Sequence, residues 1–243
     1  MGIEDLTQLE ILQAFTSLIY AITGTIVGGI IASKYFKHRK PELLGIGLSL
    51  VILTFPWYGG GISFLTYVFF DFILPDTLYF LINYGLIAFA LIFWIYGISI
   101  LLSKNVKRNT TITAIISLTY EVVFLYLLIT NISMVGVKEG RFNSDAALFP
   151  TIFVVFALLI TLITMLMFIR VCFRSEDLKI KWKGRFLLIA TLLLIIGSFM
   201  DATITLTPET LITARIILML RLIFSYLGWL LPDRVAKWLI KEE

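Results

Sequence analysis

Hydrophobic residues fill this chain in long runs, unlike the shorter amphipathic patterns of a soluble domain. Seven runs of about 20 residues or more can be marked, and each is long enough to cross a hydrocarbon core of about 30 Å as an α-helix. They cover approximately residues 9–33, 42–70, 76–102, 110–136, 147–172, 185–206 and 209–231. The pattern predicts an all-α, seven-transmembrane-helix bundle in which residues 1–243 form a single membrane domain.

The second run is interrupted by the sequence Thr54-FPWYGGG-Ile62. Pro56 removes a backbone donor and the three glycines weaken a helix, so we expect a kink or a break there. Backbone groups freed at membrane depth must be satisfied by protein or by a water-filled cavity, where Trp57 and Tyr58 would present aromatic faces to a small ligand. Alternatively, the glycines allow close helix packing and the aromatic pair marks the outer membrane interface.

Composition places the chain among integral membrane proteins. Hydrophobic residues make up 59% and charged residues 15% of it, with a mean hydropathy of +0.97. Most of the 20 Lys and Arg residues fall in alternate loops and in the tail, which by the positive-inside rule face the cytosol. We therefore expect an outside N-terminus and a cytosolic C-terminus in the cell membrane. We therefore expect the net charge of +4 to interact with lipid headgroups rather than with nucleic acid.

The two ends of the seventh run carry helix signals. Thr207-Pro208-Glu209 predicts an N-cap, a proline at the first helical position and an acid in the first turn. After Pro232 the tail places Val235, Trp238 and Leu239 on one helical face, which predicts a short helix in the headgroup layer. Alternatively, the tail simply ends the seventh helix.

Several kinds of chemistry are excluded by missing residues. A covalent retinal site needs a lysine in the seventh helix, and every lysine here falls in a loop or the tail. Seven-helix zinc hydrolases need several histidines, whereas His38 is the one histidine of the sequence. Cys172 is likewise the one cysteine, so no intramolecular disulfide is expected. We therefore expect no metal, no cofactor and no enzymatic activity.

Two arginines lie inside the seventh run, where a charge near the membrane centre usually marks a partner or a function. Arg221 lies roughly 15 Å and Glu121 roughly 16 Å from the cytosolic boundary, at about 1.5 Å per helical residue. Because the two side chains are level, we expect a buried Glu121–Arg221 ion pair between the fourth and seventh helices.

Arg215 has a different set of level neighbours. Asn83 in the third run and Asp201 in the sixth lie, like Arg215, roughly 8 to 10 Å below the outer boundary. We expect these three residues, with Trp57 and Tyr58, to line an outward-facing polar and aromatic cavity that binds a ligand. Alternatively, both polar groups form a satisfied network that holds the helices in register.

The exit of the seventh run has the sequence Tyr226-Leu-Gly228-Trp229-Leu-Leu-Pro232-Asp233-Arg234-Val-Ala-Lys237-Trp238. It resembles the end of the seven-transmembrane sensor domains of prokaryotic histidine kinases, with their aromatic-Gly-aromatic step, proline and following Trp or Arg. Asp233 stands where those domains often have a second proline. Because the sequence has no kinase or PAS-like region, the resemblance implies a sensor module that acts through a partner protein.

The leading interpretation is thus a non-retinal seven-helix membrane receptor or sensor, with membrane lipids, a small-molecule ligand and a cytosolic signalling protein as its partners. The first alternative is a small-solute transporter. Sugar-transporter-like bundles of this length carry paired prolines in matched helices, and Pro56 has no counterpart in the sixth run. The second alternative is a structural membrane subunit with no ligand.

Overall fold

The computed structural model describes residues 5–203 and 207–240, and side chains in that range except those of 201–203. Within these residues seven helical segments are long and apolar enough to cross a membrane, which confirms the predicted bundle. Four spans are unbroken helices and a fifth, α8, is continuous as far as it is described. They are α1 (Gln8–His38), α6 (Val106–Thr130), α7 (Leu148–Arg174), α9 (Pro208–Leu230) and α8 (Leu178–Thr203).

The second and third spans are broken helices. The predicted break in the second is confirmed: α2 (Pro41–Ile52) leads through the 3-10 turn η2 (Phe55–Trp57) into α3 (Tyr58–Phe70). The third divides into α4 (Asp76–Tyr84) and α5 (Ile87–Leu101), a break that sequence reasoning missed. Gly85, between the two halves, gives the signal for it.

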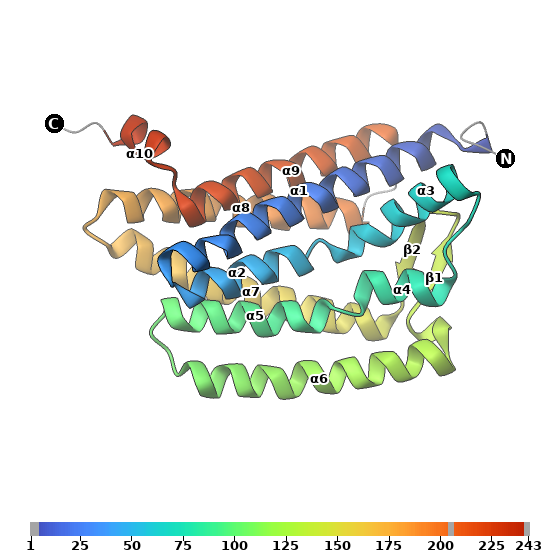
Figure 1. Cartoon of the computed structure of the whole chain (residues 1–243), viewed down its shortest axis with the longest axis horizontal. Coiled ribbons are helices and arrows are strands. Elements are labelled where there is room, and N and C mark those ends of the chain that lie inside the picture. The colour runs from blue at the N-terminus through green and yellow to red at the C-terminus, as the bar shows by residue number, and fades with distance from the viewer. Residues whose placement is uncertain (1–4, 204–206, 241–243) are drawn as a thin grey trace.

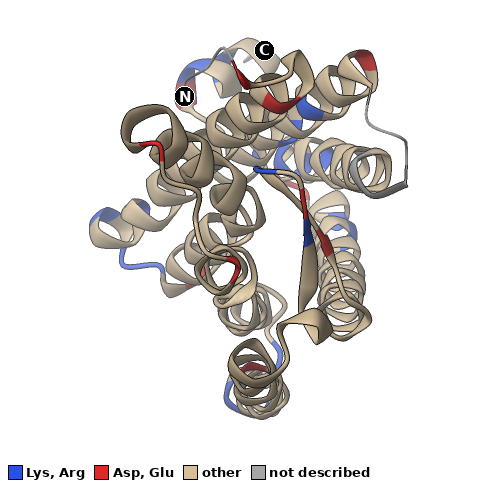
Figure 2. Cartoon of the chain, turned by 90° about the vertical axis from the view of Figure 1, so that its right-hand side faces the viewer, with Lys and Arg blue, Asp and Glu red and all other residues tan. Residues whose placement is uncertain are grey.

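Six of the seven spans form a closed ring, and the fourth span, α6, lies outside it. Following contacts around the ring, α1 packs on α2, α2 on α5, α5 on α7, α7 on α8, α8 on α9, and α9 again on α1. Helix α6 packs chiefly against α5 and is the lowest helix in Figures 1 and 2. The fourth span is therefore peripheral, which decides what its polar residues can reach.

Small residues allow a close contact between α1 and α2 in the ring. A Cβ atom added at Gly28 of α1 would lie 2.8 Å from the carbonyl oxygen of Gly47 in α2, and one added at Gly47 would collide with the Ala32 backbone. Such close backbone approach is the usual means of helix association in lipid, where burial of apolar surface supplies no net drive. The α1–α2 contact depends on these two glycines.

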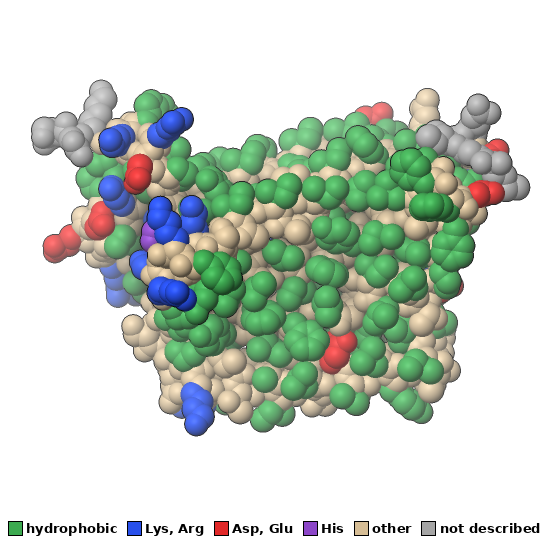
Figure 3. Space-filling view, viewed as in Figure 1, with side chains coloured by type: hydrophobic (Ala, Val, Ile, Leu, Met, Phe, Trp, Pro, Cys, Tyr) green, Lys and Arg blue, Asp and Glu red, His purple; other side chains and the backbone are tan. Residues whose placement is uncertain are grey.

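Aromatic side chains fill the ring near the basic end. The Trp229 ring stacks on Phe168 at 5.6 Å and meets Trp94 edge-on at 6.2 Å, so α9, α7 and α5 meet at one point. Lys and Arg side chains gather at this end of the molecule, and hydrophobic side chains cover the visible flank between the two ends (Figure 3). The positive-inside rule assigns the basic end to the cytosol.

The predicted helix signals around α9 are confirmed. Thr207 caps the helix by accepting a hydrogen bond from the Thr210 amide, and Pro208 is its first residue. Beyond Leu231, the short helix α10 (Asp233–Leu239) packs Val235 and Leu239 against the apolar cluster of Phe186, Leu231 and Ala236. Trp238 is 79% exposed, so it does not share their contacts and is free to meet lipid headgroups.

The other end of the ring carries a β-hairpin that the sequence did not predict. Strands β1 (Gly136–Glu139) and β2 (Asn143–Ala146) are antiparallel and follow the 3-10 turn η3 (Ile132–Met134). Gly140 takes the left-handed conformation in the turn, with φ of 72°. Figure 2 looks onto this end, where the strands run across the middle of the ring. We call residues 136–146 the hairpin lid.

Candidate functional site

The break in the second span is held by a side chain from the third span. Gly59 lies in the first turn of α3, and its amide donates a 2.8 Å hydrogen bond to the Oδ1 atom of Asn83. Backbone groups freed at membrane depth need such a partner. The Asn83 side chain is 2% exposed and is therefore a cap for α3, with its carbonyl oxygen already engaged.

The three consecutive glycines face three different neighbours. A Cβ atom at Gly59 would collide with the Asn83 carboxamide, one at Gly60 would lie 2.6 Å from the Phe142 carbonyl oxygen, and one at Gly61 would lie 3.1 Å from Leu18. These contacts join α3 to α4, to the hairpin lid and to α1. The close-packing interpretation of the glycines is thus supported.

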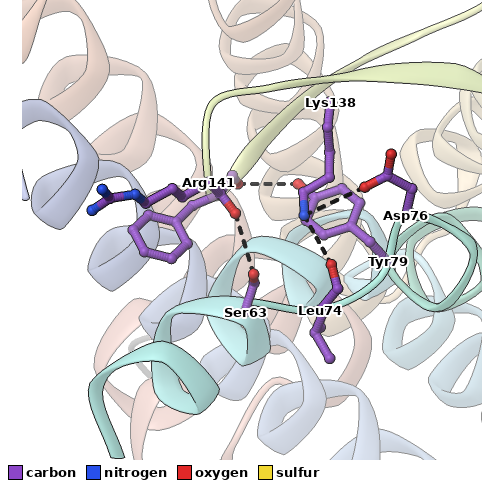
Figure 4. Close-up of polar contacts among 7 residues, drawn as sticks. Ser63, Leu74, Asp76, Tyr79, Lys138 and Arg141 are labelled. Atoms are coloured by element: carbon purple, nitrogen blue, oxygen red, sulfur yellow. Dashed lines mark hydrogen bonds and ion pairs between the residues drawn. The ribbon is translucent and has the colours of Figure 1, made fainter. Parts of the chain in front are cut away.

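The hairpin lid is fixed by hydrogen bonds from two helical residues, by one bond from its own Lys138, and by one inserted ring. The Tyr79 hydroxyl donates to the Phe142 carbonyl at 3.0 Å, and the Ser63 hydroxyl donates to the Arg141 carbonyl at 3.2 Å. Lys138 donates to the Leu74 carbonyl at 2.9 Å and lies 3.6 Å from an Asp76 carboxylate oxygen (Figure 4). The lid therefore ties itself to α3, α4 and the loop between them.

Phe142 anchors the lid within the bundle. Its ring is 4% exposed and meets the rings of Phe64 and Tyr67 at 5.6 and 6.0 Å. Arg141 lies over the other end of this cluster, 5.0 Å from the Tyr67 ring, and donates to the Tyr67 hydroxyl at 3.2 Å. The cation and the aromatic ring attract each other in this position.

The side chains of both arginines of α9 contact α1, and that of Arg215 also contacts η2. Arg221 donates to the Tyr20 hydroxyl at 2.8 Å, and Arg215 donates to the Ser17 hydroxyl at 3.5 Å while its guanidinium lies 5.8 Å from the Trp57 ring. The Tyr20 and Trp57 rings meet edge-on at 4.6 Å. Ser17, Tyr20, Trp57, Arg215 and Arg221 together form what we call the arginine site.

Burial gives the arginine site its electrostatic character. Arg215 and Arg221 are 6% and 5% exposed, and the described residues place no acid within 4 Å of Arg221. Hydrogen bonds to a hydroxyl and a guanidinium–aromatic contact offset part of the cost of burying such a charge. Arg221 thus keeps a positive charge beside a neutral hydroxyl in a low-dielectric setting, which favours an anion.

The predicted Glu121–Arg221 ion pair is wrong. Lys138–Asp76 is the one ion pair found among the described residues, and Arg221 binds Tyr20 instead. The two side chains are level in depth, but α9 belongs to the ring and α6 lies outside it against α5. Depth along a helix can be counted from sequence, whereas the order of helices around the bundle cannot.

Glu121 is therefore a buried acid that forms no ion pair with the other described residues. It is 7% exposed, and its Oε2 atom has no hydrogen-bond partner among the described residues. The hydroxyl groups of Ser117 and Tyr120, on the same face of α6, are also buried without partners. An unpaired acid inside a membrane span is a candidate for proton or cation binding.

Replacing Glu121 by glutamine should therefore change the free energy of unfolding by less than about 1 kcal/mol, because no ion pair is lost. Breaking a buried pair would instead cost about 3 to 5 kcal/mol. Chemical denaturation of the purified protein in detergent measures the difference. A loss of 3 kcal/mol or more for Glu121→Gln would show that the carboxylate has a charged partner after all.

The five residues predicted to line one outward-facing cavity do not come together as predicted. Trp57 and Arg215 meet in the arginine site, but Asn83 caps α3 and Tyr58 bonds to Thr25 at 2.9 Å. The side chain of Asp201 lies outside the described residues, so its predicted place beside Arg215 stays a prediction. Asn83 and Arg215 are also buried, and the hairpin lid crosses this end of the ring.

Sequence reasoning missed Ser17 and Tyr20. Both belong to a stripe of small and polar residues at helical spacing along α1, which continues through Ala21, Gly24 and Gly28. Such a stripe in an apolar helix marks the face that packs inside a membrane bundle. The signal was present, but it names no partner helix.

We expect the stability of the hairpin lid to depend on pH. A hydrogen bond with Asp145 and the charge of that carboxylate raise the pKa of Glu139 above its ordinary value. The folded lid then binds a proton more readily than the unfolded chain, so lowering the pH through the raised pKa of Glu139 should stabilise the lid. Glu139→Gln should accordingly melt at a higher temperature than wild type at pH 7.5.

This difference in melting temperature should shrink as the pH falls toward about 4, where a carboxyl is largely protonated. Glu139 is fully exposed, so the effect is small and decreases with added salt. A melting-temperature difference that does not change with pH would contradict the assignment to this carboxyl pair.

No protein-family model matches this sequence, and none of the curated proteins compared with it matches at a significant level. Function is therefore inferred from the positions and chemistry of the residues themselves.

Proposed function

We propose that this seven-helix membrane protein is a receptor that binds a small anion at the arginine site and signals through a partner protein in the cytosol. One observation carries the proposal. Arg221 is 5% exposed at mid-membrane depth, and its hydrogen-bond partner among the described residues is the neutral hydroxyl of Tyr20. Charges kept at such a depth usually serve a function.

The broken second span supports a site that responds to its ligand. Trp57 belongs to the short η2 turn between two helix breaks, and its ring touches both Tyr20 and the Arg215 guanidinium. Short irregular segments at membrane depth typically occur where they line a binding site. An anion at Arg221 would compete with the Tyr20 hydroxyl for the guanidinium, which changes the surroundings of the Trp57 ring that packs on Tyr20.

Helix α9 offers a route for the signal. It carries both arginines and ends, through Leu231 and Pro232, at the start of α10. A shift of α9 would displace α10 and its exposed Trp238 at the basic end. The resemblance of this exit to kinase sensor domains is consistent with such a readout.

The test is anion binding by the purified full-length protein in neutral detergent. Chloride, phosphate, sulfate, acetate and succinate are titrated while the melting temperature and tryptophan fluorescence are recorded. Ligand at about 100 times its Kd stabilises the folded state by about 2.7 kcal/mol, which corresponds to several degrees. At least one anion should do so for wild type and for the control Arg234→Gln, but not for Arg221→Met. If none of the five anions stabilises the wild type, the proposal fails.

The buried carboxyl of Glu121 supports solute transport as the second candidate function. Its unpaired carboxyl lies in a span outside the ring, and buried acids of this kind form proton relays in transporters. Proteoliposomes loaded at one pH and diluted into another, with labelled acetate or phosphate outside, distinguish the two functions. Uptake that Glu121→Gln abolishes would favour a transporter, and binding without uptake would favour the receptor.

A further inference from the structure

A cleft separate from the arginine site opens between α5, α6 and α7. Its volume is about 320 Å³, at the lower end of the range of small-ligand pockets. Apolar side chains form most of its wall, among them Ile95 and Ile98 of α5. Ile112 of α6 and Met167 of α7 also line it and are 51% and 42% exposed, so the cleft opens sideways toward the hydrocarbon.

Polar groups gather at the end of the cleft near the basic face of the molecule. Asn109 donates to the Ser99 hydroxyl at 3.2 Å and joins α6 to α5, while Thr113 lines the cleft one turn further along α6. Deeper in, Thr164 of α7 accepts a 2.9 Å hydrogen bond from the Trp94 indole. The cleft therefore has a polar and charged mouth, and its walls are mainly apolar with the Thr164 hydroxyl already bonded to Trp94.

One basic residue lies at this mouth and two more follow close by in the sequence. Lys104 lines the cleft, and Lys107 and Arg108 lie in the first turn of α6. The sequence has no acid between Asp76 and Glu121, and none of these three bases has an acidic partner among the described residues. These bases also lie at the N-terminus of α6, which is the positive end of the helix dipole. A bound anion would reduce the repulsion between the bases and that end of the dipole.

We propose that this cleft binds an anionic phospholipid of the cytosolic leaflet. The headgroup phosphate binds at Lys104, Lys107 and Arg108, and one acyl chain lies along Ile98, Ile112 and Met167. Basic pockets between transmembrane helices on the cytosolic side are suited to acidic headgroups. The amphipathic order of the cleft, with charge at the membrane surface and apolar walls at acyl depth, matches such a lipid and no water-soluble anion.

The test uses the full-length protein in nanodiscs or mild detergent, with phosphatidylglycerol titrated against phosphatidylcholine and bound lipid counted by native mass spectrometry. The wild type should retain phosphatidylglycerol preferentially. Each base removed in Lys104→Gln, Lys107→Gln and Arg108→Gln should weaken it about fivefold, corresponding to about 1 kcal/mol per base. The matched control Lys34→Gln/Lys37→Gln/Arg39→Gln removes three bases from the same end of the molecule and should keep the preference.

A second variant separates the acyl site from charge alone. Thr113→Trp fills the cleft without changing charge and should reduce phosphatidylglycerol retention at least tenfold, with folding checked by its melting curve. Equal loss in the control triple variant would reduce the effect to general surface attraction and overturn the proposal. Unchanged retention in Thr113→Trp, or equal stabilisation by inorganic phosphate, would also overturn it.

Discussion

Replacing Arg221 by methionine should raise the stability of the ligand-free protein by up to about 2 kcal/mol. Arginine at the membrane centre costs about 2.5 to 3.5 kcal/mol on insertion scales, and one hydrogen bond to a charged group returns about 1.5 to 3 kcal/mol. Replacing buried charge by packed apolar atoms is often stabilising by about 1 to 4 kcal/mol. Denaturant titration in detergent and the melting temperature measure the gain.

Tyr20→Phe is the matched comparison for this result. It keeps the buried guanidinium and removes its 2.8 Å hydrogen-bond acceptor, so it should lose about 1.5 to 3 kcal/mol of stability. Opposite signs for the two variants would identify Arg221 as a charge kept at a cost, as a binding site requires. If Arg221→Met instead loses more than about 2 kcal/mol, the arginine holds the helices in register and the structural-network interpretation is correct.

Gly60→Val should detach the hairpin lid and destabilise the protein by about 1 to 3 kcal/mol. Even a single Cβ atom at this position lies 2.6 Å from the Phe142 carbonyl oxygen, which is backbone and cannot rotate away. Overpacking of this kind carries the stated cost. The melting temperature reports the lost stability, and trypsin cleavage after Lys138 or Arg141 reports the loosened lid.

Gly29→Val in α1 is the control for this prediction. A Cβ atom at Gly29 meets nothing within 4 Å, so the added side chain should reach lipid and leave stability within about 1 kcal/mol. The lid of the control should resist trypsin as the wild type does. Equal trypsin resistance in Gly60→Val would mean that the lid adjusts to the extra atoms, and that the glycine is not needed for its attachment.

The break in the second span shows how much local sequence can predict. Pro56 and the glycines predicted the interruption because proline lacks a donor and glycine favours no helix. The sequence left open whether the glycines served a ligand or close packing. The structure supports packing, since each glycine faces a different neighbour within 3.1 Å of an added Cβ atom.

The buried charges show the opposite case. Counting residues placed Arg221 and Glu121 at one depth, and that estimate supplied a partner of the right charge. The prediction failed because α6 lies outside the ring, a property set by long-range helix packing that hydropathy does not encode. Helices of similar apolar character can occupy either position.

The hairpin lid was missed for a related reason. Its strands are four residues each, too short for a reliable alternating pattern, and the fourth hydrophobic run was extended into β1. Phe142 appeared in the sequence as an isolated apolar residue in a polar loop. Its partners, Phe64 and Tyr67, come from a helix more than 70 positions earlier.

The sequence by itself determined the seven spans, the basic end, the broken second span and the presence of two costly arginines, because lipid imposes length, charge placement and backbone satisfaction on each helix separately. Tertiary structure alone decided which helices touch. It placed Arg221 on Tyr20, gave Glu121 no charged partner within the described part of the chain, and laid a lid across the ring. These outcomes depend on contacts between distant residues, and depth along one helix does not specify them.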